Sequence, residues 1–79
     1  MPTLLFVHGL RFFFYSNENN EPIHIHVTKG DAAGKIWLDP VIKIAYLYGF
    51  TSSEGKMIRE TVKENFVIFK RKWHEYFNK

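Results

Sequence analysis

The sequence contains no cysteine, which excludes disulfide bonds, thiolate metal sites and cysteine nucleophiles. Long hydrophobic runs are also absent, since no segment approaches the ~18 apolar residues that a membrane span needs. The apolar run near the start, Leu4 to Val7, lacks the basic region and the small-residue cleavage site of a signal peptide. We therefore expect a cytoplasmic protein with no membrane partner.

Excess charge of one sign is confined to the C-terminal third. Residues 1–55 hold four basic and five acidic side chains, whereas residues 56–79 hold seven basic and three acidic ones. This asymmetry favours RNA, DNA or another acidic partner. A solvated basic helix face is the simpler alternative, because charged side chains mostly face water.

The chain is short but rich in apolar residues. Its 79 residues are 46% hydrophobic and 18% aromatic, which is too apolar for a disordered chain and fits one small domain. We predict a single domain over residues 1–79, strand-rich over 1–48 and helical over about 52–78.

Short apolar runs separated by turn residues predict the strands. From Ile23 to Thr28, apolar and polar residues alternate, so His24 and His26 share the polar face of one strand. A hairpin turn is predicted at Lys29 to Asp31. The other predicted strands are 4–7, 10–15, 35–38 and 41–47, the last with a helical turn as its alternative.

After Phe50 the apolar spacing changes to that of a helix. Thr51 or Ser52 can cap its start, with Glu54 near the positive end of the helix dipole. A core-facing stripe follows at steps of three and four residues: Ile58, Val62, Phe66, Phe69, Trp73 and Tyr76.

One helix over 52–78 would be roughly 40 Å long. That is long for so small a domain, so we expect a late start at Gly55, a kink, or packing of the end on a partner chain. We predict a buried Trp73, helical order almost to Lys79 and a homodimer through the aromatic end. The fold class is α+β, a bent antiparallel sheet of four to five strands with a long C-terminal helix across one face.

The histidine pair suits three roles. One imidazole could act as general base and the other as general acid, with Arg11 stabilising a phosphorane in metal-free RNA cleavage. The pair could instead hold part of a metal site, although zinc needs three or four ligands. The further ligand would have to come through the fold from His8, Asp31 or Glu18. Simple exposure on the sheet is the third possibility.

Of these roles we carry forward the catalytic one. The predicted catalytic residues are His24, His26 and Arg11, with no metal and no cofactor. Because Arg11 interrupts an apolar strand, its guanidinium needs a partner, either a phosphate or a carboxylate. Glu18 and Asp31 are the candidate carboxylates.

Four cations on the predicted helix lie on one side of its apolar stripe and could track a phosphate backbone. These predicted nucleic-acid-binding residues are Lys56, Arg59, Lys63 and Lys70. The aromatic run Phe12 to Tyr15 could add a stacking platform, as in RNA-binding sheets. We expect most of these rings in the core, because the helix must cover one sheet face.

Several segments resemble a small bacterial family catalogued as domain of unknown function 4160. The resembling residues are Gly9-Leu10-Arg11-Phe12, Tyr15-Ser16-Asn17-Glu18, His24-Ile25-His26-Val27, Gly34-Lys35-Ile36-Trp37-Leu38, Gly49-Phe50-Thr51, Glu64-Asn65 and Trp73-His74-Glu75-Tyr76-Phe77. Gly55 departs from the family, which usually has a helix-favouring apolar residue there, and His74 stands where Asn is common.

The resemblance implies a protein often encoded beside a second small protein, as in type II toxin–antitoxin modules. It thereby implies an antitoxin-like partner, and some relatives are labelled transcriptional regulators. We therefore expect a ribonuclease-like toxin that acts on RNA. The alternative is a non-enzymatic module that binds a partner protein or DNA, so whether the chain is an enzyme stays open.

Overall fold

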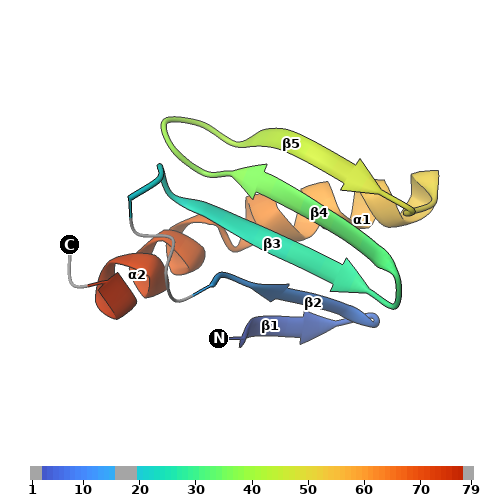
Figure 1. Ribbon diagram of the computed structural model, residues 1–79, viewed down its shortest axis with the longest axis horizontal. Coiled ribbons are helices and arrows are strands. Elements are labelled where there is room, and N and C mark those ends of the chain that lie inside the picture. The colour runs from blue at the N-terminus through green and yellow to red at the C-terminus, as the bar shows by residue number, and fades with distance from the viewer. Residues whose placement is uncertain (1–2, 16–19, 78–79) are drawn as a thin grey trace.

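The computed structural model describes residues 3–15 and 20–77. Five antiparallel strands follow one another across a single sheet, and two helices complete the chain (Figure 1). The elements are β1 (Thr3–Val7), β2 (Leu10–Phe13), β3 (His24–Lys29), β4 (Ala32–Trp37), β5 (Lys43–Tyr48), α1 (Ser52–Glu64) and α2 (Phe66–Phe77). The predicted α+β fold with an antiparallel sheet is therefore confirmed.

Two tight hairpin turns set the register of the sheet. His8 and Gly9 both have positive φ angles, 54° and 78°, and they join the paired residues Val7 and Leu10. Positive φ at both central positions is the geometry of a type I′ turn, whose twist matches that of the strands. The predicted turn between β3 and β4 is also present, with Gly30 at φ 58°.

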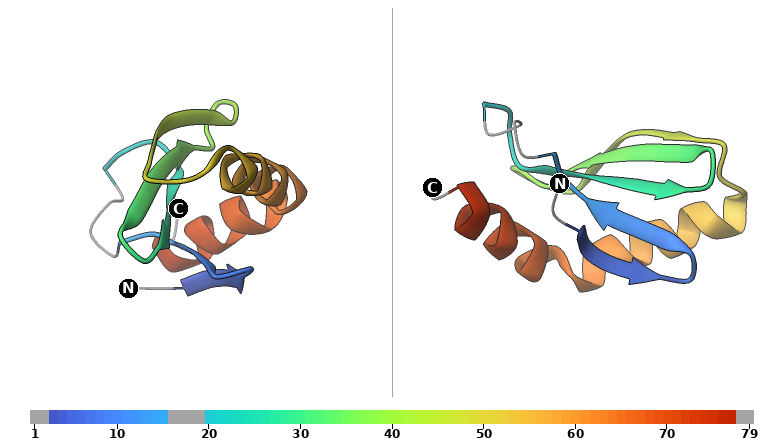
Figure 2. Two further views of the ribbon diagram at one scale, coloured as in Figure 1. Left: turned by 90° about the vertical axis from the view of Figure 1, so that its right-hand side faces the viewer. Right: turned by 60° about the horizontal axis from the view of Figure 1, so that its bottom comes forward.

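Both helices lie on the same face of the sheet (Figure 2). The core forms between them and the alternate strand residues that point toward them. Its members are Leu10, Phe12, Phe14, Ile23, Ile25, Val27, Ile36, Leu38, Ile58, Val62, Phe69 and Trp73. The strict alternation predicted for β3 explains why Ile25 and Val27 point inward together.

The predicted helix over 52–78 is divided in two. Its first part ends at Glu64, and Asn65 leaves helical geometry with φ −110° and ψ 16°. The backbone N–H and the Nδ2 of Asn65 both donate to the Thr61 carbonyl, at 3.0 and 2.8 Å. The predicted kink is thus present, and it lets Ile58 and Trp73 both bury against a short sheet.

The start of α1 is capped as predicted. The Thr51 hydroxyl accepts a hydrogen bond from the Glu54 N–H at 3.1 Å, and the Glu54 carboxylate accepts one from the Thr51 N–H at 2.9 Å. This reciprocal pair is a capping box. Lys29 of β3 donates to the same carboxylate at 2.7 Å and ties the helix start to the sheet.

The far end of α2 is anchored by aromatic rings. Trp73 is 3% exposed, which confirms its predicted burial. Its indole lies 5.2 Å from the Phe14 ring and 4.5 Å from the Phe77 ring, measured between centroids. Lys79 lies outside the described residues, and the homodimer stays a prediction. Within the part of the chain that the structure describes, neither helix is long and apolar enough to cross a membrane.

Candidate functional site

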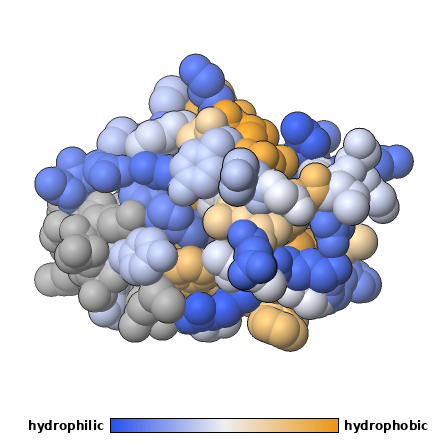
Figure 3. All heavy atoms as spheres, turned by 45° about the vertical axis from the view of Figure 1, so that its right-hand side comes forward, coloured by the Kyte–Doolittle hydropathy of each residue, from blue (hydrophilic) through white to orange (hydrophobic). Residues whose placement is uncertain are grey.

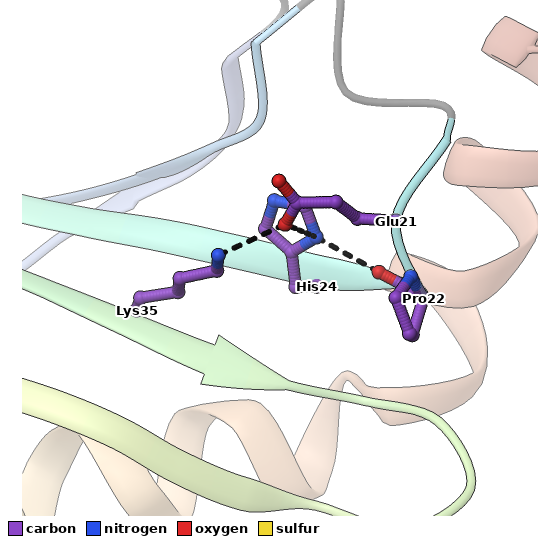
Figure 4. Close-up of polar contacts among 4 residues, drawn as sticks. All are labelled: Glu21, Pro22, His24 and Lys35. Carbon is purple, nitrogen blue, oxygen red and sulfur yellow. Dashed lines mark hydrogen bonds and ion pairs between the residues drawn. The ribbon is translucent and has the colours of Figure 1, made fainter.

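The two histidines of β3 have different environments. We predicted both on the polar face of one strand, with simple exposure as one of three possibilities. Exposure is wrong for His24, which is 0% exposed. Trp37 of β4 and Trp73 of α2 pack around it, with ring centroids 5.3 and 5.2 Å away. Its Nδ1 donates to the Pro22 carbonyl at 2.8 Å (Figure 4). His26 is only partly buried and keeps access to the surface.

Glu21 lies close to both His24 and Lys35. Its carboxylate is 3.0 Å from the Lys35 ammonium and 3.9 Å from His24 Nδ1 (Figure 4). The same ammonium lies 4.3 Å from the centre of the Trp37 ring, a cation–π distance. Lys35 is therefore held in place on β4, because its ammonium contacts both the Glu21 carboxylate and the Trp37 ring.

Arg11 has contacts other than the predicted carboxylates. Its Nε donates to the Thr3 hydroxyl at 3.0 Å, and its guanidinium lies 4.6 Å from the centre of the Phe13 ring. Glu18 falls outside the described residues. Among the residues that are described, Arg11 has no carboxylate within ion-pair distance, Asp31 included.

The three predicted catalytic residues lie along one row of side chains. Phe13 pairs with His26 across the strands, and its ring stacks on that imidazole with centroids 5.5 Å apart. His26 in turn lies 5.2 Å from His24. The row is a packed stack, with Phe13 between the guanidinium and the imidazoles, rather than an open cleft. The catalytic assignment stays a prediction.

No metal centre is visible in the described ranges 3–15 and 20–77. These residues contain no group of three His, Asp or Glu side chains that could hold a metal ion. His8 lies in the turn between β1 and β2 and Asp31 in the turn between β3 and β4, so neither joins the histidine pair.

Aromatic side chains on the side of the sheet opposite α1 and α2 form the feature that sequence reasoning missed. We call this side the open face, and its accessible residues on β4 and β5 are Lys35, Trp37, Lys43, Tyr46 and Tyr48. Tyr46 is 49% and Tyr48 75% exposed, and Trp37 is partly exposed. The predicted platform at Phe12 to Tyr15 is mostly core, as expected, with only Tyr15 at the surface.

The sequence of β5 carries the alternating pattern that would reveal the open face, but one extra residue interrupts this pattern. Lys35 pairs with Tyr46 and Ile36 with Ile44, so Ala45 is an extra residue that forms a bulge in β5. The bulge breaks the period of two along the strand, which hides the fact that Lys43, Tyr46 and Tyr48 share one face. In the space-filling view, hydrophobic residues reach the surface in separate places among hydrophilic ones (Figure 3).

The predicted basic strip is split by the break between the helices. Lys56, Arg59 and Lys63 are exposed on α1, whereas Lys70 is on α2 and lies 4.9 Å from the centre of the Phe66 ring. Two of the α1 cations, Arg59 and Lys63, line a cavity of about 340 Å³ beside β5. The four cations therefore belong to two helices, and their role in nucleic-acid binding stays a prediction.

Comparison with known proteins gives a family and nothing more specific. Residues 9–74 match the family model described as Domain of unknown function (DUF4160). Neither the curated proteins nor the solved structures contain a match to this chain.

Proposed function

Because the chain belongs to the DUF4160 family, whose description assigns no activity, we propose a function from the geometry of the open face. We propose that the protein binds single-stranded RNA there, without cleaving it. The observation that carries this proposal is the grouping of Trp37, Tyr46 and Tyr48 with cations on the face of β4 and β5 that neither helix covers in the described part of the chain.

Aromatic rings at the surface of a sheet suit unpaired bases. A base that stacks on an aromatic side chain contributes roughly 1–3 kcal/mol, and every base offers such a face. Tyr46 and Tyr48 lie on the edge strand, opposite Lys35 and Ala33 of β4, so rings and charge alternate over two neighbouring strands. A flexible single strand could lay bases on the rings while its phosphates meet the cations.

Charge on the open face is of one sign along the strands. None of the five strands contains Asp or Glu, whereas Arg11, Lys35 and Lys43 all point to the open face. Lys35 is already paired with Glu21, so a phosphate would compete with that carboxylate. A site with about three phosphate contacts predicts a slope of log affinity against log salt near −2, since each contributes about −0.7 for single strands.

Cleavage is the second candidate, and the geometry supports it less. A general acid–base pair must reach the proton that it transfers. His24 is fully buried and its Nδ1 is bonded to a backbone carbonyl, so only His26 has access to a bound strand. A toxin role, and an antitoxin-like partner, stay predictions that rest on family resemblance.

Fluorescence anisotropy with a labelled twelve-residue oligouridine tests the proposal. Tyr46→Ala should weaken binding about tenfold or more, because one stacked base is lost. Tyr76→Ala on α2 is the matched control, since Tyr76 is also 49% exposed but lies on the helical side. Melting curves of both variants verify that they fold.

Two outcomes would contradict the proposal. If Tyr46→Ala and the parent bind RNA with equal affinity, no base stacks on Tyr46 and the proposed stacking platform is wrong. If the protein cleaves the oligouridine during the assay and His26→Ala does not, the protein is a ribonuclease and the proposal of binding without cleavage is wrong.

A further inference from the structure

A groove separates the edge strand β5 from helix α1. We call it the β5 groove, and its lining residues are Ile42, Ile44, Arg59, Glu60 and Lys63. It measures about 340 Å³, with the two isoleucines on the sheet side and the charged side chains on the helix side. The groove lies on the helical side of the sheet, so it is separate from the open face.

The strand beside the groove has an unpaired edge. Among the described strands, β5 pairs only with β4, and no element lies beyond it (Figure 1). Outward-pointing N–H and C=O groups of such an edge can accept a further strand from another chain. The side chains of that strand would alternate between the groove and the open face.

The helix side of the groove is basic. Arg59 and Lys63 are one turn apart on α1, and both are exposed. A Cβ atom placed on Gly55 would lie 3.3 Å from a guanidinium nitrogen of Arg59 and 3.7 Å from a methyl of Leu47. The guanidinium therefore lies on the side of α1 that faces β5, where it can meet a ligand held at the strand edge.

We propose that the β5 groove binds an acidic, extended peptide segment of a partner protein, added to β5 as a sixth strand. Aliphatic side chains of the peptide would contact Ile42 and Ile44, and its carboxylates would pair with Arg59 and Lys63. Main-chain bonds to β5 would supply affinity, and the alternating groove-facing side chains would supply specificity.

A nucleic acid fits this groove less well, although Arg59 and Lys63 belong to the basic strip predicted for it. The floor is aliphatic, which gives a phosphate backbone no favourable contact. Glu60 also lines the groove, and its charge opposes a phosphate and a peptide carboxylate alike, so the aliphatic floor decides between the two ligands. A peptide with both aliphatic and acidic side chains satisfies the floor and the cations together.

The probe is a labelled, end-capped peptide, Ile-Thr-Glu-Thr-Ile-Thr-Glu-Thr, which places isoleucine and glutamate on one side of an extended chain. Its control replaces both glutamates by lysine. The expected result is binding of the acidic peptide, weakened about tenfold in the double variant Arg59→Gln, Lys63→Gln. The double variant Arg71→Gln, Lys72→Gln removes the same charge from exposed positions on α2 and should leave the affinity unchanged.

Strand addition is tested separately by methylating alternate backbone nitrogens of the probe. One of the two methylation patterns should abolish binding, because alternate N–H groups of an added strand face β5. The proposal is overturned if the acidic and basic peptides bind alike, or if both methylated peptides bind like the parent. It is also overturned if Arg59→Gln, Lys63→Gln weakens oligouridine binding and leaves peptide binding unchanged.

Discussion

Two glycines should respond in opposite ways to the same substitution. At Gly34 in β4, a Cβ atom would lie 2.6 Å from a methyl of Leu47, 3.1 Å from the Tyr46 carbonyl and 3.1 Å from a methyl of Val27. Overpacking of this kind costs about 1–3 kcal/mol. Replacing glycine by alanine also restricts the unfolded chain, which returns about 0.4–1 kcal/mol. The net expectation for Gly34→Ala is a loss of roughly 1–2 kcal/mol.

At Gly55 in α1, the same Cβ would meet only the mobile tip of Arg59 at 3.3 Å and a Leu47 methyl at 3.7 Å. Alanine in place of glycine inside a helix favours folding by about 0.8–1 kcal/mol. Gly55→Ala should therefore raise the stability that Gly34→Ala lowers.

Thermal unfolding followed by circular dichroism measures both variants. A change of 1 kcal/mol shifts the melting temperature of a domain this small by roughly 4–8 °C. We expect a drop of roughly 5–15 °C for Gly34→Ala and a rise of a few degrees for Gly55→Ala. A rise for Gly34→Ala would refute the close packing of Leu47 over β4. A large drop for Gly55→Ala would refute the spacing between α1 and β5.

Three further predictions concern the anchors of the fold and the histidine pair. Trp73→Ala should cost about 3–5 kcal/mol, enough to unfold a marginal domain, and melting at several protein concentrations separates a core role from a dimer role. The hydrogen bond from Lys29 lowers the pKa of Glu54 below its ordinary value of 4.5. The stability from this carboxylate is therefore present above pH 4.5 and lost as the pH falls through the lowered pKa. The melting temperatures of the parent and of Glu54→Gln should accordingly converge in acid. A difference that stays constant from pH 7 to about pH 3 would contradict a stabilising role of the Glu54 carboxylate. His24→Ala should lower the melting temperature more than His26→Ala, because only the first imidazole is fully buried, and equal effects would contradict that burial.

The local patterns of the sequence predicted most of the fold. Alternation over Ile23 to Thr28 placed β3 correctly, since one buried face imposes a period of two on a strand. The cap was predicted at Thr51 or Ser52, with Glu54 near the helix start, because capping joins residues only a few positions apart; the structure shows a capping box of Thr51 and Glu54. The helical stripe identified Trp73 as a core residue for the same local reason.

Features that depend on tertiary packing were not readable. A kink was expected from the length of the helix, but its position at Asn65 was not, because no glycine or proline marks it. His24 obeys the alternation of β3, but its burial comes from Trp37 and Trp73, which belong to other elements. The open face was hidden by one bulged residue, Ala45.

Binding of single-stranded RNA by the open face is the central claim. Its most direct test is a titration of the ¹⁵N-labelled protein with unlabelled oligouridine, followed by the amide signals. We predict that the largest shifts occur at Trp37, Tyr46 and Tyr48, with smaller ones at neighbouring residues of β3 to β5. Shifts confined to the two helices, or none at all at saturating oligouridine, would contradict the claim.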